Sequence, residues 1–297
     1  MDALGRLTIG LLLASLSLVS ANAANQAKPI QIGMAKSFVT ERPKSQVDIA
    51  TDEFKDVMKK TTGLDGELTS KFGALDVADK LKNKQLDLGI LHAHEFAWVQ
   101  KKYPDLQPLL IAAGKHRVER AYLIVHKTNP AKSVADLRGK KFDMPNDVAE
   151  HGRLYVEKLC AESAKLAPAQ FFNAIVKSAS QIDAFDDVAR GNADATVADT
   201  ARLEFYKEIK GPVFAKNLRV LQESETFPPA VIVTLKGGLD EATVKQFRDG
   251  LLKAQTTAAG RDMMKTWNIE AFEPIPDDYA KSLAEVLKAY PVPTSPR

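Results

Sequence analysis

The chain has 297 residues, of which 45% are hydrophobic and 27% charged, a composition that excludes a disordered chain. Its 41 lysines and arginines against 38 aspartates and glutamates leave a net charge of +3, which argues against a dedicated nucleic-acid binder. The length predicts about two domains, each large enough to bury its own core.

The N-terminal segment has the pattern of a secretory signal. Arg6 precedes an apolar run at residues 7–19 that is too short to span a bilayer, and Ala21-Asn22-Ala23 has the small-x-small pattern of a cleavage site. We therefore expect a signal peptide over residues 1–23 and a product exported to the periplasm; an N-terminal membrane anchor is the alternative. The single cysteine, Cys160, cannot form an intrachain disulfide.

Short apolar runs alternate with amphipathic segments along the rest of the chain. This alternation predicts an α/β fold in which parallel strands are covered by helices on both faces. The predicted strands lie at residues 29–34, 87–91, 109–113, 121–126, 141–144, 174–179, 193–198, 218–221 and 230–235. The predicted helices lie at residues 45–60, 75–81, up to about 103, 133–139, 149–161 and 182–190, with further helices after residue 240.

Six segments occur in the order found in one protein family. The chain resembles the periplasmic solute-binding proteins of ABC importers, in the phosphonate- and phosphate-binding branch. The resemblance covers the chain from about Ile30 to Tyr290. One such motif alone would be weak evidence for the family. The segments are LDLGILHAHEFAW, SVADLRGKKF, FFNAIV, ARGNADATVAD, TFPPAVIV and GRDMMKTWNIEAFEPI.

The resemblance implies a type 2 periplasmic binding fold, with two α/β lobes joined by two crossing strands and a ligand held in the cleft between them. Lobe one is expected at residues 24–119 and 230–297, and lobe two at residues 120–229. The implied ligand is a small oxyanion or organic solute, held by a site that differs from the family's, and the implied partner is an ABC permease in the inner membrane. We expect a monomer without a cofactor or catalytic activity.

The candidate site follows from the same resemblance and from the position of residues at strand ends. Open α/β sheets bind ligands beyond the carboxyl ends of their strands and at the helix starts that follow. The expected ligand-binding residues are Ser37, His92, Glu95, Phe96, Asn146, Glu150, His151, Gln181 and Asp199.

The chain departs from the family pattern at the positions that bind the ligand. Where the phosphonate binders carry a Ser-Thr-Ser-Gly run, this chain reads Ala149-Glu150-His151-Gly152, so three hydroxyls are lost and a carboxylate is gained. A carboxylate within about 4 Å of a phosphonate would cost several kcal/mol. We therefore expect phosphate and simple phosphonates to bind far more weakly than in members that keep the run, with a neutral or cationic group accommodated instead. Alternatively, Glu150 is a solvated residue of the first helical turn.

Three other functions stay open at this point. Imidazole and carboxylate are the ligands of zinc, copper and similar ions, so His92, His94, Glu150 and His151 are candidates for binding a divalent metal or metal chelate. A sensor subunit that presents its ligand to a membrane kinase would have the same fold. An enzyme is the remaining alternative, although the chain contains none of the common catalytic motifs.

Overall fold

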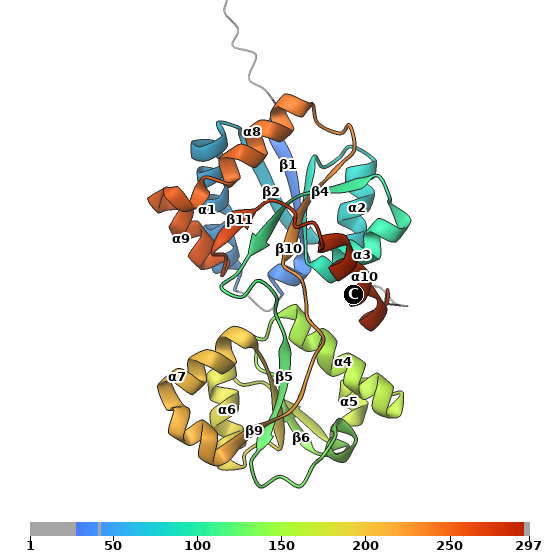
Figure 1. Ribbon diagram of the computed structural model, residues 1–297, viewed down its shortest axis with the longest axis vertical. Coiled ribbons are helices and arrows are strands. Elements are labelled where there is room, and N and C mark those ends of the chain that lie inside the picture. Colours follow the sequence, from blue (N-terminus) through green and yellow to red (C-terminus); the bar gives the residue numbers. More distant parts are fainter. Residues whose placement is uncertain (1–27, 41–42, 294–297) are drawn as a thin grey trace, which may run out of the picture.

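The computed structural model describes residues 28–40 and 43–293, so the predicted signal peptide at residues 1–23 lies outside the described residues. The described chain forms two α/β lobes, one above the other in Figure 1. None of the described helices combines the length and the apolar character needed to cross a bilayer. The structure confirms the predicted two-lobed α/β fold.

Lobe one is built on a six-stranded sheet with the order β11-β4-β10-β3-β1-β2. Helices α1, α8 and α9 cover one face, and α2, α3 and α10 cover the other (Figure 1). Its elements are β1 (Ile30–Ala35), the 3₁₀ turn η1 (Lys36–Phe38), α1 (Lys44–Thr62), β2 (Gly66–Phe72), α2 (Ala74–Lys82), β3 (Leu88–Leu91), α3 (Ala93–Lys102), β4 (Leu106–Ala113), β10 (Ala230–Leu235), α8 (Glu241–Leu251), η3 (Ala254–Thr256), α9 (Ala258–Thr266), β11 (Ala271–Glu273) and α10 (Tyr279–Ala289).

Lobe two is built on a five-stranded sheet with the order β7-β6-β8-β5-β9. Helices α4 and α5 lie on one face, and α6 and α7 on the other. Its elements are β5 (Ala121–His126), η2 (Val134–Leu137), β6 (Lys141–Asp143), α4 (Glu150–Ala164), α5 (Pro168–Phe171), β7 (Ala174–Val176), α6 (Gln181–Arg190), β8 (Ala195–Asp199), α7 (Thr200–Asn217) and β9 (Leu218–Glu223).

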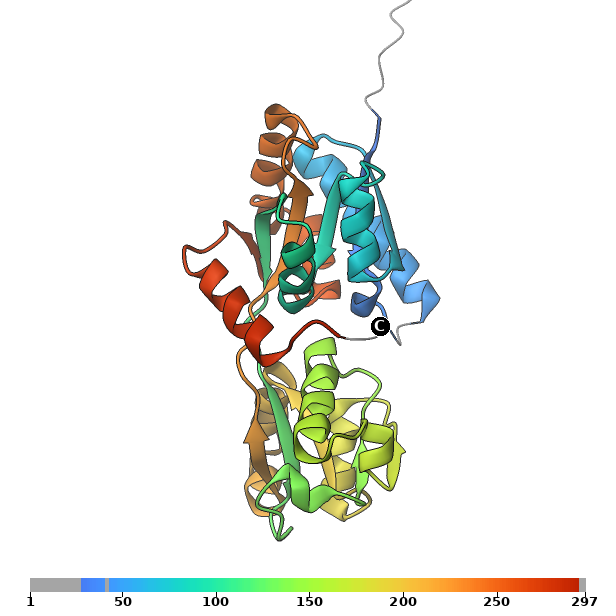
Figure 2. The same cartoon turned by 90° about the vertical axis from the view of Figure 1, so that its right-hand side faces the viewer.

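Two chain segments connect the lobes, residues 114–120 after β4 and residues 224–229 before β10, and they run side by side in Figures 1 and 2. The segments are antiparallel, and the amide N–H of Glu119 and of Phe227 each donate to the other residue's carbonyl, at 2.9 and 2.8 Å. The lobe limits predicted at residues 120 and 229 lie within these connections. Two connections that pair at a single antiparallel bridge between the lobes are a suitable hinge.

Both sheets are mixed, whereas the alternation of strands and helices predicted parallel strands. In each lobe, the strand that arrives from the other lobe is antiparallel to its neighbours: β10 to β3 and β4, and β5 to β8 and β9. A strand that crosses between lobes enters from the hinge side and so runs opposite to the strands of the βαβ units. Apolar runs cannot reveal this direction, because a buried strand has the same composition in either orientation.

Helix α7 has no counterpart in the predicted elements, and neither has β2. In α7, Leu203 and Tyr206 are buried while Phe205, Ile209 and Val213 are exposed. Apolar residues therefore surround the helix instead of forming one stripe, which removes the periodic signal. The opposite error occurred at residues 133–139, where only the short turn η2 forms, because Arg138 is extended and Gly139 has a φ of +72°.

Gly250 lies where α8 crosses α1, and we expect its replacement by alanine to destabilise lobe one. A Cβ atom there would lie 2.7 Å from the Thr61 carbonyl oxygen and 2.8 Å from the Thr62 Cα, and backbone cannot move aside cheaply. Gly250→Ala should lower the free energy of unfolding by about 1–3 kcal/mol in urea titrations. The matched control is Gly211→Ala in α7, where a Cβ would meet no atom within 4 Å. Equal stability of the two variants would contradict this packing role of Gly250.

Candidate functional site

A cleft of about 840 Å³ lies between the two lobes. Lobe one contributes the ends of β1 and β3 and the turn η1, and lobe two contributes the segment before α4 and the start of α7. Both connecting segments line it as well, so opening or closing of the lobes would change its width. Of the nine predicted ligand-binding residues, six line this cleft: Ser37, His92, Asn146, Glu150, His151 and Asp199.

Glu95 is held behind the cleft wall and does not line it. The side chain is 6% exposed, and its carboxylate accepts hydrogen bonds from the Ser37 hydroxyl at 2.7 Å and from the His92 amide N–H at 3.0 Å. The prediction of Glu95 as a ligand contact is therefore corrected. It caps α3 and fixes two residues that do line the cleft.

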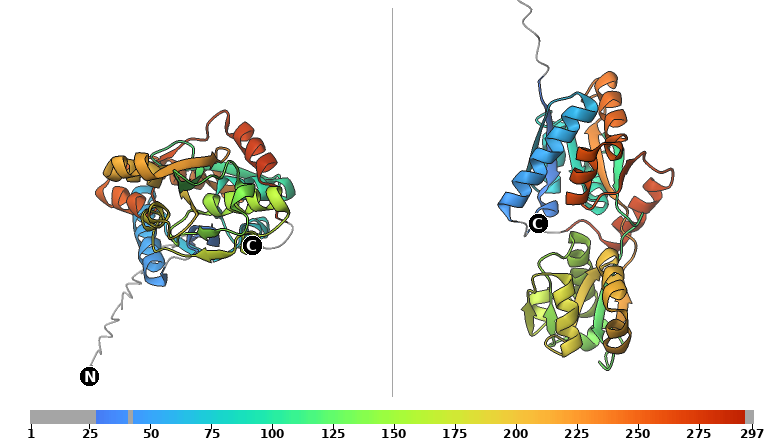
Figure 3. Two further views of the ribbon diagram at one scale, coloured as in Figure 1. Left: turned by 90° about the horizontal axis from the view of Figure 1, so that it is seen from below. Right: turned by 90° about the vertical axis from the view of Figure 1, so that its left-hand side faces the viewer.

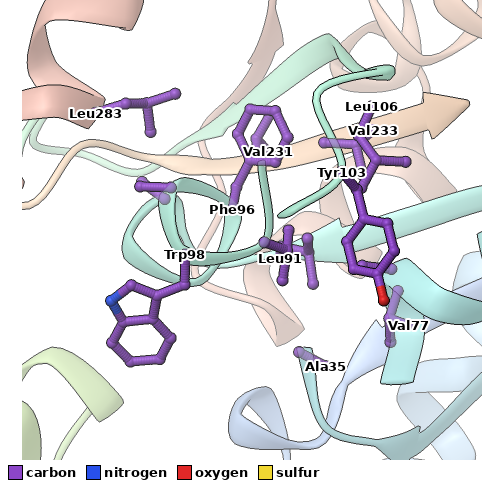
Figure 4. Close-up of a cluster of buried hydrophobic side chains, with 14 of the residues drawn as sticks. Ala35, Val77, Leu91, Phe96, Trp98, Tyr103, Leu106, Val231, Val233 and Leu283 are labelled. Carbon is purple, nitrogen blue, oxygen red and sulfur yellow. The ribbon is translucent and has the colours of Figure 1, made fainter. Parts of the chain in front are cut away.

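Phe96 was also predicted to line the cleft, and this was wrong. It is fully buried in the core cluster under α3 and α10, near Leu283 and Val231 in Figure 4. His92 precedes α3 with an extended backbone, whereas Phe96 lies in the first turn of the helix and packs in the cluster that α3 covers. Phe96 therefore contributes to the stability of lobe one and not to the binding surface.

Three rings form a stack on the lobe-one side of the cleft. The ring centroids of Phe38 and His92 are 3.7 Å apart at an interplanar angle of 18°, and those of His92 and His94 are 5.4 Å apart at 8°. His94 then contacts the edges of Trp98 and Phe227. The stack fixes the orientation of His92, whose Nε2 is buried and has no hydrogen-bond partner among the described residues.

Lobe two presents the start of α4 to the same cleft. The residue before this helix is Ala149, whose side chain cannot cap it, and Glu150 and His151 form its first turn. The retained Gly152 is explained by packing, since a Cβ there would lie 2.7 Å from the Val148 side chain. His151 packs on Phe227, with ring centroids 5.2 Å apart, and its buried Nε2 also has no hydrogen-bond partner in the described part of the chain.

Gln181 positions the site instead of contacting a ligand, which corrects its predicted role. It is 1% exposed, and its amide donates to Asp199 Oδ2 at 2.8 Å and to the Asp147 carbonyl at 3.2 Å. Its Oε1 accepts from the Asp199 amide at 2.9 Å. These bonds hold the cleft residue Asp199, which also caps α7 by accepting from the Arg202 amide at 2.8 Å.

Burial keeps the two cleft imidazoles neutral. It lowers the pKa of His92 to about 3, and the proximity of His151 lowers it further. Burial likewise lowers the pKa of His151, although the Asp199 carboxylate opposes this change. At the hinge, burial and then the charge of Asp199 raise the pKa of Glu119 to about 7. The cleft therefore offers neutral hydrogen-bonding groups from both lobes.

The hypothesis of a metal site at His92, His94, Glu150 and His151 gains no support from the geometry. Within residues 28–40 and 43–293, no group of three or more histidine, cysteine, aspartate or glutamate side chains is placed to hold a metal ion. The imidazoles of His92 and His94 are stacked face to face, and this arrangement does not direct two ring nitrogens at one ion.

Phe38, Glu119 and Phe227 are among the cleft residues that the sequence did not reveal. Phe227 lies in the TFPPAVIV segment, which carried the family resemblance but gave no reason to assign it a contact with both His94 and His151. Glu119 precedes the predicted crossing strand, and only the pairing with the second connection places its carboxylate in the cleft.

Two α/β lobes, joined by a two-stranded hinge around a lined cleft, define the class of two-lobed periplasmic binding proteins. The family model for the periplasmic substrate-binding protein of phosphonate ABC transporters matches residues 37–279. The chain therefore belongs to this family, as its sequence motifs predicted. Among curated protein sequences, none matches the chain significantly.

Solved structures show the same fold at low sequence identity. A Xanthomonas citri protein bound to ATP has a TM-score of 0.60 and 18% identity, covering 88% of this chain and 96% of its own. The PhnD1 protein of Prochlorococcus marinus, in complex with methylphosphonate, has a TM-score of 0.59 and 13% identity, covering 88% and 97%. A binding-protein component of a Pseudomonas aeruginosa ABC phosphonate transporter has a TM-score of 0.58 and 16% identity, covering 87% and 85%.

Proposed function

We propose that this protein is exported, captures a small organic solute of low net charge in the interlobe cleft, and delivers it to the permease of an ABC importer. One observation supports the proposal above all. The Nε2 atoms of His92 and His151, one from each lobe, are buried in the cleft without a protein partner among the described residues. Such atoms are costly to bury unless a ligand or water bonds them, and a ligand that bonds both would hold the lobes together.

The charges of the cleft favour low net charge in the ligand. Basic and acidic side chains nearly balance in its lining, although the raised pKa of Glu119, about 7, leaves this carboxylate only partly ionised at neutral pH. They are Lys115, Arg117, Arg153, Arg202 and Lys265 against Glu119, Asp147, Glu150, Asp199 and Glu270. A phosphate dianion would meet both Glu150 and Asp199 on the lobe-two side. A zwitterionic or neutral solute avoids this repulsion and can still use the backbone N–H groups at the start of α4.

Calorimetric titration of the mature protein at pH 7 tests the proposal. We expect 2-aminoethylphosphonate, which carries both charges, to bind at least tenfold more tightly than phosphate. His92→Ala and His151→Ala should each weaken this binding about tenfold, because each removes one buried hydrogen bond and leaves its partner unsatisfied. The control is His126→Ala, since His126 bonds Thr128 at the far end of β5, outside the cleft.

Two results would contradict the proposal. One is submicromolar binding of phosphate with no response to the zwitterion. The other is binding of any solute that His126→Ala weakens as much as the two cleft substitutions do.

A further inference from the structure

The cleft extends beyond the polar site into the interior of lobe one. Part of its wall is formed by apolar side chains that project from one face of the sheet. Ile90 and Ile232 are register partners on β3 and β10, and Phe272 on β11 pairs with Ala112 on β4. We call this space, between the sheet and helices α1 and α9, the apolar chamber. Its lining consists of Met34, Phe54, Leu68, Ile90, Ala112, Ile232, Met263, Trp267, Ile269 and Phe272.

The chamber differs from a filled core. Leu68, Ile90 and Trp267 are large apolar residues at the inner end of the cleft, yet each stays only partly buried against the core cluster of α1, α8 and α9. Water in such a space finds few polar partners, so its displacement by hydrocarbon is favourable.

The chamber and the polar site are connected. Ile90 precedes His92 by two residues at the end of β3, and both line the same cleft. The combined volume of about 840 Å³ falls in the range of roughly 300–1,000 Å³ typical of sites for organic ligands of drug size. All the lining residues of the chamber belong to lobe one, so lobe closure would not remove it. Figure 3 shows the ribbon of this lobe, with α1 in blue, from two further sides.

We infer that the apolar chamber is a second compartment of the ligand site, which takes a hydrocarbon or aromatic group of a ligand whose polar head lies between His92 and His151. This inference rests on the proposed function of the cleft. It narrows the ligand from small organic solutes in general to amphiphilic ones. A head group alone would leave the chamber empty, whereas a chain of several carbons would bury its surface against Leu68, Ile90 and Trp267.

The test is calorimetric titration with two homologous series, the neutral n-alkanamides and the zwitterionic 1-aminoalkylphosphonates, each of two to eight carbons. Burial of each added methylene should raise the affinity about fourfold until the chamber is full. Ala112→Leu places a larger side chain in the chamber. It should weaken binding of the longer members at least tenfold, while the affinity for the two-carbon members stays within twofold of the wild-type value. Ala215→Leu, at an exposed position of α7, is the matched control.

Tryptophan fluorescence gives a second readout, which does not depend on the Ala112→Leu variant. The chain has two tryptophans, and Trp267 lines the chamber whereas Trp98 is buried in the other core cluster. A six-carbon ligand should change the emission of the wild type and of Trp98→Phe, but not of Trp267→Phe.

The outcomes separate this inference from the proposed function. A flat dependence on chain length in both series, with two-carbon members that bind and respond to His151→Ala, overturns the apolar chamber and leaves the proposed function intact. Absence of binding for every member of both series and for 2-aminoethylphosphonate overturns both.

Discussion

Between pH 6.5 and pH 4, the wild-type protein is expected to lose about 3 kcal/mol more of its unfolding free energy than the His92→Gln variant. The reason is the buried imidazole of His92, whose pKa falls from an ordinary 6.5 to about 3, first through burial and then through the proximity of His151. The folded state therefore binds fewer protons than the unfolded state. This contribution to stability is complete above pH 6.5 and is lost as the pH falls toward 3.

Urea titrations of the ligand-free protein at half-unit pH steps would measure this difference. Glu119 acts in the opposite direction, because its raised pKa of about 7 removes stability as the pH rises from 4.5 through 7. Because both proteins contain Glu119, its contribution to the unfolding free energy cancels when the two are compared. His126→Gln controls for the loss of a histidine outside the cleft, and it should follow the wild type. If the unfolding free energies of the wild type and of His92→Gln fall by the same amount between pH 6.5 and pH 4, the lowered pKa of His92 is contradicted.

Gln181→Leu is expected to lower the unfolding free energy by about 1–3 kcal/mol. The side chain is fully enclosed and makes three hydrogen bonds, two of them to Asp199. Leucine has a similar size but cannot replace these hydrogen bonds. Asp199 and Asp147 both line the cleft, where water can reach them, so the loss is smaller than for fully buried groups. Because Asp199 then loses its fixed position in the cleft, ligand affinity should fall as well.

The matched control for this substitution is Gln222→Leu, at an exposed position on β9. It should stay within about 0.5 kcal/mol of the wild type. If Gln181→Leu unfolds at the same urea concentration as Gln222→Leu, the bonds of Gln181 do not hold the lobe-two wall of the cleft.

Much of the fold could be predicted from the sequence, because apolar runs and helical spacing are local signals. The strand that ends before His92 and the helix that starts at Glu150 occur where they were expected. The direction of the two crossing strands was not predictable, because it depends on which lobe each strand comes from. Helix α7 escaped prediction because its exposed face carries Phe205, Ile209 and Val213.

The site was predictable to the level of strand ends, but not to the level of side-chain direction. His92 and His151 line the cleft, whereas Glu95, Phe96 and Gln181, at equally suitable positions, are turned inward. The difference arises from packing within each lobe, such as the hydrogen bonds of Glu95 to Ser37 and to the His92 amide. Contacts made across the hinge by Phe227 depend on both lobes at once, and no local pattern encodes them.

The central claim is that a ligand binds between His92 and His151, and imidazole NMR tests it most directly. The chain has five histidines, so ¹⁵N-histidine labelling gives five resolvable ring systems, assigned through single substitutions. On titration with a solute whose binding calorimetry has established, we predict that the ring nitrogens of His92 and His151 shift strongly and saturate together, while those of His126 stay in place. A saturating ligand that leaves both His92 and His151 unshifted would contradict the claim.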